Sequence, residues 1–377
     1  MANTWIISPD WQNEITATTY GNLPNGDNSS IDTARIAFSN LQTHLNRSVT
    51  AGQVFSNGIV STYSLVITGS GAYHGGVLAP NGDIHFIPNG AAVGQKISPS
   101  GVVSTYSLVY TSIGTSRGGV LAPNGDIHFI PQDASRGQKI SASGVVSTYS
   151  LVHTVGTFAY FGGVLAPNGD IHFVPYTVAV GQKVSAAGVV STYSLVYTVG
   201  AAYQGGVLAP NGDIHFIPYN AVVGQKISPA GVVSTYSLVY TAANAYAGGV
   251  LAPNGDIHFI PIGANRGQKI SPTGVVSTYS LVYTSAGGAA VGGVLAPNGD
   301  IHFVPRNTGV GQKISSAGVV STYSLLYNAG NYAGGVLAPN GDIHFIPFSA
   351  AVGQVIVTGA AVPFDIGTCC SPFFNKF

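Results

Sequence analysis

The sequence predicts an all-β fold, a seven-bladed β-propeller with four antiparallel strands in each blade. The first observation is a repeat: the segment Gly75–Phe86, GGVLAPNGDIHF, returns with few changes about every 43 residues. A period in this range is typical of repeat architectures, in which each unit packs against its neighbours. The second observation is that each period contains four short strand-like segments, the number in one propeller blade. The third is that the repeat occurs seven times, starting at Gly75, Gly118, Gly162, Gly205, Gly248, Gly292 and Gly334.

Each repeat divides into four predicted strands in a fixed order. Val77–Pro80 is a short apolar strand. The Asn81-Gly82 dipeptide that follows is typical of a two-residue hairpin, because both of its residues accept a positive φ. Asp83–Pro88 is the returning strand, and Gly94–Ser98 and Val102–Thr111 are the third and fourth. The order predicts an up-and-down antiparallel sheet.

The two ends of the repeat region predict how the ring closes. Seven first-and-second-strand units and seven third-and-fourth-strand units are present, and the chain begins with the latter at Gly52. The chain therefore starts halfway through one blade and ends halfway through one, and we expect these halves to pair so that no sheet edge stays open. Gly353–Val357 is a further third-strand candidate, which competes with Gly52–Phe55 for this blade. The sequence leaves open which of the two closes the ring.

The composition excludes several classes of function. Charged residues make up 7% of the chain and the formal net charge is +0, so we expect no nucleic-acid partner, which would require a basic surface. The first residues contain no cationic segment followed by an apolar run, so we expect no secretory signal. No uninterrupted apolar stretch approaches the roughly 18 residues of a membrane helix, so we expect no membrane insertion. The two cysteines, Cys369 and Cys370, are adjacent and cannot join distant segments.

The first 50 residues do not repeat and predict one helix at about residues 31–46. Ala34, Phe38, Leu41 and Leu45 fall on one helical face, which either packs on the propeller or binds a partner. We therefore divide the chain into an N-terminal attachment segment (1–50), the propeller (51–359) and an aromatic C-terminal tail (360–377).

Part of this N-terminal segment matches a known sequence pattern. Gly26, Asp27, Arg35, Ala37 and Phe38 match a pattern, Gly-Asp … Arg-x-Ala-Phe-x-Lys-Ile-Asn-x-Asn-Phe, over about 20 residues. The segment resembles the one found near the N-termini of many bacteriophage tail and fibre proteins. The sequence departs from that pattern just afterwards, at Asn40, Gln42, His44 and Leu45.

The blade pattern also resembles the kelch and galactose-oxidase type. A Gly-rich first strand and a tight Gly-containing turn lead into the second strand, over residues 52–359, although the aromatic signature of kelch repeats is absent.

The repeated polar residues suggest structure more than chemistry. Seven symmetry-related histidines could line a channel and hold a metal. However, the second strand lies farther from the axis than the first, so we expect the histidine rings to lie between blades and to hydrogen-bond to backbone or to Ser, Thr or Tyr of the fourth strand. They are His85, His128, His172, His215, His258, His302 and His344. We expect Asp83 and its equivalents to pair with Lys96 and its equivalents. No set of nucleophile and base breaks the symmetry, so we expect no enzyme, no metal site and no cofactor.

The copies differ mainly on one face of the predicted ring. The turns that join strands one and two, and three and four, are nearly fixed and share a face. The blade-to-blade and second-to-third loops vary, and they lie on the other face, where loops on a rigid scaffold often bind ligands. The alternative is neutral drift in tolerant loops. The variable face includes Phe158, and the predicted binding residues are Tyr73, Arg117, Arg136, Tyr160, Tyr203, Tyr246, Arg266, Arg306 and Tyr332.

Taken with the N-terminal resemblance, these patterns predict a bacteriophage virion protein of the tail, baseplate or a fibre. The variable face would bind host-surface glycan or another virion protein, and the N-terminal segment and C-terminal tail would contact other virion proteins, in a monomer or a homo-oligomer. We expect the protein to be made in the host cytoplasm and to reside in the virion. The alternatives are a purely structural virion decoration or assembly protein and a cellular propeller lectin.

Overall fold

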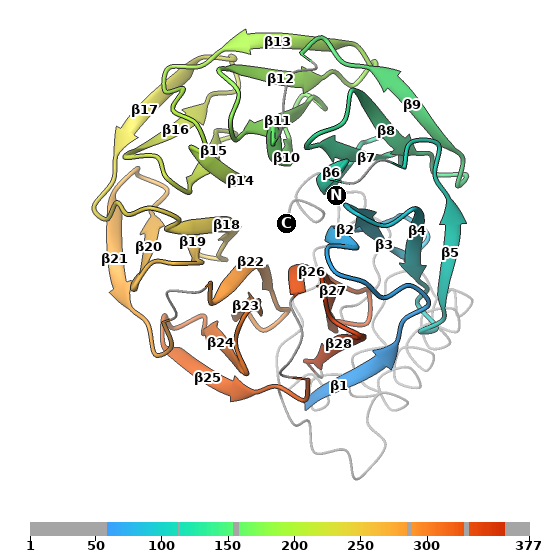
Figure 1. Ribbon diagram of the computed structural model, residues 1–377. Coiled ribbons are helices and arrows are strands. Elements are labelled where there is room, and N and C mark those ends of the chain that lie inside the picture. Colours follow the sequence, from blue (N-terminus) through green and yellow to red (C-terminus); the bar gives the residue numbers. More distant parts are fainter. Residues whose placement is uncertain (1–58, 112–113, 154–157, 285–287, 328–331, 359–377) are drawn as a thin grey trace, which may run out of the picture. The chain divides into compact units, whose positions relative to one another are not determined.

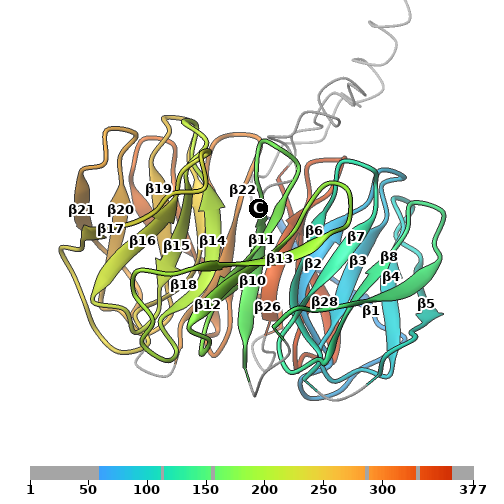
Figure 2. The same ribbon diagram turned by 90° about the horizontal axis from the view of Figure 1, so that it is seen from above.

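The computed structural model describes residues 59–358, except 112–113, 154–157, 285–287 and 328–331. These residues belong to one unit, Ser56–Phe377. They form 28 strands in seven four-stranded antiparallel sheets, which are arranged as blades around a central axis (Figures 1 and 2). None of the described residues forms a helix. The all-β seven-bladed propeller is therefore confirmed.

The strands occupy four concentric positions in the ring. The innermost strands are β2 (Tyr73–Leu78), β6 (Ser116–Leu121), β10 (Tyr160–Leu165), β14 (Tyr203–Leu208), β18 (Tyr246–Leu251), β22 (Ala290–Leu295) and β26 (Tyr332–Leu337). The second strands are β3 (Ile84–Pro88), β7 (Ile127–Pro131), β11 (Ile171–Pro175), β15 (Ile214–Pro218), β19 (Ile257–Pro261), β23 (Ile301–Pro305) and β27 (Ile343–Pro347).

The third and outermost strands complete each blade. The third strands are β4 (Val93–Ile97), β8 (Arg136–Ile140), β12 (Val180–Val184), β16 (Val223–Ile227), β20 (Arg266–Ile270), β24 (Val310–Ile314) and β28 (Val352–Val357). The outermost strands are β5 (Val103–Ser107), β9 (Val146–Ser150), β13 (Val190–Ser194), β17 (Val233–Ser237), β21 (Val276–Ser280), β25 (Val320–Ser324) and β1 (Ile59–Ser64). Blades 1 to 6 follow the chain from β2, and blade 7 consists of β26, β27, β28 and β1.

Blade 7 closes the ring with strands from both ends of the repeat region. β1 pairs along its whole length with β28, from Ile59 opposite Val357 to Ser64 opposite Val352. Figure 1 shows β1 at the perimeter beside β28, although they are far apart in sequence. The third strand of this blade is thus the C-terminal candidate, and Gly52–Phe55 lies outside the described residues. Closure by strand exchange is as the sequence predicted.

A glycine and a tyrosine fix the register between the third and fourth strands. Gly94 lies opposite Tyr106, and the Tyr106 ring occupies the space where a side chain at Gly94 would begin. An aromatic ring over a strand glycine restores the packing that the glycine lacks. The same pair recurs in all seven blades, including Gly353 with Tyr63 in blade 7.

Buried glutamines join each blade to the preceding one. Gln95 in β4 accepts hydrogen bonds from the backbone N–H groups of Val66 and Ile67, which follow the outermost strand of blade 7, at 3.0 and 2.7 Å. The contact recurs in every blade through Gln138, Gln182, Gln225, Gln268, Gln312 and Gln354.

This contact also corrects the length of the fourth strand. The sequence predicted Val102–Thr111, whereas β5 ends at Ser107. The chain leaves the sheet because the N–H groups of Val109 and Tyr110 turn to Gln138 of the next blade.

Several predictions fall outside the described residues: the helix at 31–46, the tail at 360–377, and both cysteines. Within the described part of the chain, nothing helical is available to cross a membrane.

Candidate functional site

The strand directions divide the propeller into two faces. The Pro-Asn-Gly-Asp turns of all seven blades and the Ser-x-x-Gly turns of blades 1 to 6 lie at the same end of the blades, which we call the turn face. The second-to-third connections, such as residues 89–92, and the blade-to-blade connections lie at the other end, which we call the variable face.

The residue before each Gly-Gly pair of an innermost strand forms a ring at the variable-face end of the axis. We call this ring the axial collar. It consists of His74, Arg117, Phe161, Gln204, Ala247, Val291 and Ala333. The first six, together with the Gly-Gly pairs of all seven blades, line a cavity of about 160 Å³ on the axis. The collar is therefore a concave site at which the copies differ from one another.

Glycine is required below the collar because the strands meet there. Gly75 has a φ of +82°, which strains any other residue, and a side chain on it would begin only 3.1 Å from the Gly118 backbone. The contact continues around the ring and closes where Gly334 meets Gly75. The floor of the cavity is therefore backbone, and all of its chemical variety comes from the collar side chains.

One half of the collar carries a stack of a cation on two aromatic rings. The Arg117 guanidinium carbon lies 3.7 Å from the centre of the Phe161 ring, a cation–π contact. Phe161 stacks on Tyr176 with a centroid separation of 3.7 Å and an interplanar angle of 15°. Burial lowers the pKa of Arg117 to about 10, so the side chain remains a cation at neutral pH.

Arg117 has no carboxylate partner among the described residues. All six ion pairs there join a lysine to an aspartate of the same blade. The Arg117 Nε is buried and has no hydrogen-bond partner in that part of the chain. The side chain as a whole is half-buried, and a buried guanidinium N–H ordinarily has an acceptor, so this guanidinium is a candidate anion ligand.

Two other blades add a neutral imidazole, His74 of blade 1, and a second cation, Arg306, which lies beside the collar. Burial, with the charges of Arg117 and Arg306, lowers the pKa of His74 well below its usual range. His74 meets the edge of Phe348 at a centroid distance of 5.9 Å, and Arg306 lies 5.9 Å over the same ring. His74 is thus uncharged at pH 7.

The variable face is net positive in the described part of the chain. It carries four arginines, Arg117, Arg136, Arg266 and Arg306, and one aspartate, Asp133. Asp133 already accepts hydrogen bonds from the Phe158 N–H and from Gln132 Nε2, the latter at 3.2 Å.

The tyrosines predicted as rim contacts are buried, and that prediction was wrong. All five are at most 1% exposed, and the Tyr73 hydroxyl donates to the Val93 carbonyl of its own blade at 3.1 Å. They pack on second-strand phenylalanines in the blade core, as Tyr73 does on Phe86. The buried set is Tyr73, Tyr160, Tyr203, Tyr246 and Tyr332. In each of these five blades the collar residue is the one directly after the tyrosine.

The predicted arginines divide into two groups. Arg117 belongs to the collar and Arg306 lies beside it. Arg136 and Arg266 are exposed at the start of third strands, two strands out from the axis. Phe158 is 44% exposed in a blade-to-blade loop.

The predicted structural partners are present for four of the seven repeated histidines and for six of the seven repeated aspartates. His85, His172 and His344 have no hydrogen-bond partner for Nδ1 among the described residues, and blade 7 has Val355 in place of the lysine. The Nδ1 atoms of four of the histidines lie 3.2–3.4 Å from the hydroxyl of the fourth-strand tyrosine in the same blade. The Lys–Asp pairs are 2.6–2.7 Å long. In the described ranges, no group of three or more His, Cys, Asp or Glu residues converges to hold a metal.

Comparison with known proteins places the fold. No protein-family model and no curated protein matches the sequence. A streptogramin B lyase of known structure is 20% identical with a TM-score of 0.72, and the match covers 81% of this chain and 100% of that one. The likeness is one of fold.

Two further structures show the same likeness. A catalytically inactive virginiamycin B lyase from Staphylococcus aureus, solved with quinupristin, is 16% identical with a TM-score of 0.71, over 80% of this chain and 100% of that one. The extracellular domain of a hybrid two component system from B. thetaiotaomicron is 12% identical with a TM-score of 0.62, over 81% of this chain and 43% of that one.

Proposed function

We propose that the propeller is a ligand-binding module whose axial collar binds an acidic sugar at the end of a cell-surface glycan. The observation that carries this proposal is Arg117, a half-buried cation on the axis that stacks on Phe161 and has no carboxylate partner among the described residues. A guanidinium is the side chain best suited to bind a carboxylate or sulfate through two parallel hydrogen bonds.

The surrounding residues support an anionic ligand with an apolar face. Arg306 adds positive charge, and the aromatic rings of Phe161, Tyr176 and Phe348 offer rigid apolar surface. The cavity of about 160 Å³ is smaller than the roughly 300–1,000 Å³ of sites that enclose a whole small molecule. We therefore infer that one terminal acidic group enters the collar and that the rest of the glycan lies over the variable loops.

A matched pair of arginine variants tests this proposal. Arg117→Gln removes the collar cation, and Arg136→Gln removes an exposed arginine of the same face that lies two strands away from the axis. On an array of sialylated, uronic-acid and sulfated glycans, we expect Arg117→Gln to weaken binding at least about tenfold, which is about 1.4 kcal/mol, and Arg136→Gln to leave it within about twofold. Equal losses in both variants would point to nonspecific charge attraction and refute a collar site.

We further propose that this module belongs to a bacteriophage tail, baseplate or fibre, held there by residues 1–50 and by the C-terminal tail, as a monomer or a homo-oligomer. The support is the N-terminal match at Gly26, Asp27, Arg35, Ala37 and Phe38; the kelch-like blade pattern adds nothing to this placement. If deletion of 1–50 abolishes incorporation into particles while Arg117→Gln leaves host adsorption intact, the purely structural virion role replaces the binding role. If the deletion has no effect on either, a cellular propeller lectin is the better explanation.

A further inference from the structure

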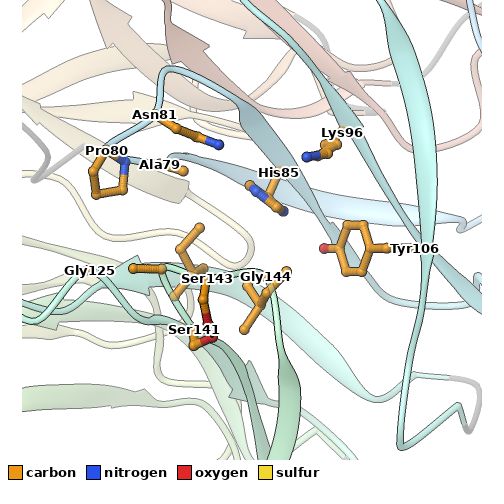
Figure 3. Close-up of a pocket in the computed structure, with 13 residues that line it drawn as sticks. Ala79, Pro80, Asn81, His85, Lys96, Tyr106, Gly125, Ser141, Ser143 and Gly144 are labelled. Carbon is orange, nitrogen blue, oxygen red and sulfur yellow. Dashed lines mark hydrogen bonds between the residues drawn. The ribbon is translucent and has the colours of Figure 1, made fainter.

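A second cavity lies on the turn face, between blades 1 and 2. Its volume is about 470 Å³, within the roughly 300–1,000 Å³ that is usual for small-molecule sites. Blade 1 contributes the Pro80-Asn81 turn, His85 and Lys96, and blade 2 contributes Gly125 and the turn at residues 141–144. Figure 3 shows the two sets of residues facing each other across the opening. The cavity is separate from the axial collar, which lies at the other end of the blades.

A small side chain at one repeat position contributes to the space. In three blades the second residue of the Ser-x-x-Gly turn is a proline, as at Pro99, whose ring packs over Gly82 of the preceding turn. In blade 2 the same position is Ala142, which leaves out the outer atoms of that ring. Ala186 and Ser316 are the other small residues at this position. The sequence SASG in blade 2 is also the one turn in the described repeats that combines a small second residue with a hydroxyl at the third, Ser143.

The polar groups around the cavity are neutral or already paired. Lys96 donates to Asp83 at 2.6 Å, so the pair adds no net charge. The hydroxyls of Ser141 and Ser143 lie 2.9 Å apart and rotate freely enough to donate or accept. The His85 ring meets Tyr106 at a centroid distance of 5.3 Å, and both His85 Nδ1 and the Tyr106 hydroxyl are buried without a hydrogen-bond partner among the described residues.

The remaining walls are apolar and fixed by the scaffold. Pro80, Ile127, Ile140 and Ala142 line the cavity between these polar groups. Hydroxyl, amide and imidazole groups next to aliphatic surface suit a ligand that has hydroxyls at its edge and C–H groups on its faces. A net-neutral set of partners does not favour a charged ligand.

We propose that the cavity between blades 1 and 2 binds one neutral sugar ring or cyclic polyol. Ser143 and Lys96 would bond its hydroxyls, and Pro80 and Ala142 would contact its apolar face. One such site is expected per chain, because the other described turns carry proline at the second position or lack a hydroxyl at the third.

The repeat supplies substitutions that its own blades already tolerate. Ala142→Pro turns the blade 2 loop into the SPSG sequence of blade 1 and fills the cavity. Ser143→Ala copies the alanine found at this position in three other blades, as at Ala187. Ser100→Ala makes the same change beside Pro99 and is the matched control.

The experiment is NMR titration of the full chain and each variant with the neutral methyl glycosides of glucose, galactose, mannose and fucose. We expect at least one glycoside to bind the unmodified protein with a Kd of about 1 mM. Its affinity should fall at least about tenfold in Ala142→Pro and in Ser143→Ala, and should not change in Ser100→Ala or Arg117→Gln. No saturable shift at about 50 mM glycoside, or equal affinity in Ala142→Pro, would overturn the proposal. Because Arg117→Gln tests the collar separately, failure of either site is distinguishable from failure of the other.

Discussion

Acid should destabilise this propeller in a pH window set by its repeated histidines. Burial, with the charge of the neighbouring lysine in six of the blades, lowers the pKa of each second-strand histidine from 6.5 to about 4. Between these two values the unfolded chain binds a proton that the folded chain does not. The free energy of unfolding must therefore fall as the pH is lowered through this window, and it stops falling from this cause below about pH 4.

The expected loss is large because the site occurs seven times. At pH 5 a histidine with these two pKa values costs about 2 kcal/mol of stability, since one pKa unit corresponds to about 1.4 kcal/mol. Seven of them together cost about 14 kcal/mol, which is comparable with the 5–15 kcal/mol stability of a typical domain. The Asp–Lys pairs act in a different pH window. Hydrogen bonds and charge from their lysines lower the pKa values of Asp126, Asp170 and Asp300, so these pairs lose their contribution to stability only at still lower pH.

The assay is urea unfolding followed by far-ultraviolet circular dichroism at pH 7.5, 6 and 5, values that run from above the window into it. We expect the unfolding midpoint to fall steadily, and His128→Gln to reduce the dependence on pH by about one seventh. The Tyr149 hydroxyl can still pair with the glutamine amide in that variant. A midpoint that is constant between pH 7.5 and 5, or histidine pKa values near 6.5 by NMR, would refute the account of buried neutral imidazoles.

Three further predictions address packing, ring closure and the absence of catalysis. Gly137→Ala places a side chain 2.1 Å from the Tyr149 ring and should lower stability by about 1–3 kcal/mol in thermal unfolding, whereas Gly69→Ala, with open space around it, should change it little. Gln182→Leu leaves two backbone N–H groups of the preceding blade without an acceptor and should lower stability by about 2–5 kcal/mol, whereas Thr192→Ala at an exposed position should cause no measurable change. Equal unfolding midpoints for these two variants would show that the glutamines do not stabilise the closed ring. Incubation with quinupristin should give no cleavage product by mass spectrometry, and time-dependent product would overturn the prediction that the protein is not an enzyme.

The fold could be predicted from the sequence because the same pattern of strands and turns occurs seven times. A fixed period, an Asn-Gly turn and two-residue alternation determine the strand order without knowledge of the packing. The sequence alone does not identify the third strand of the closing blade, because Gly52–Phe55 and Gly353–Val357 have similar sequences. The structure places Gly353 under Tyr63, and Gln354 accepts a cross-blade hydrogen bond from the Tyr327 N–H as its equivalents do from theirs.

The collar was missed for a reason of geometry. Tyrosines are common contact residues, and nothing in the sequence separates Tyr73, which faces the core, from His74, which faces the axis. A register shift between Tyr73 and Gly76 interrupts the alternation that would otherwise assign their faces. The available signal was that tyrosine recurs in five blades, as a core residue does, while the residue directly before the constant Gly-Gly pair changes from blade to blade. The glutamines were missed because their partners lie in another blade, and that proximity exists only once the ring is closed.

The most direct test of the central claim is the affinity of the intact protein for one acidic glycan, sialyllactose or a uronic-acid disaccharide, compared between the unmodified chain, Arg117→Gln and Arg136→Gln. The account predicts binding that the collar substitution reduces at least about tenfold and that the rim substitution leaves within about twofold. Binding that is indifferent to Arg117, or that is lost equally with Arg136, would contradict a ligand site on the propeller axis.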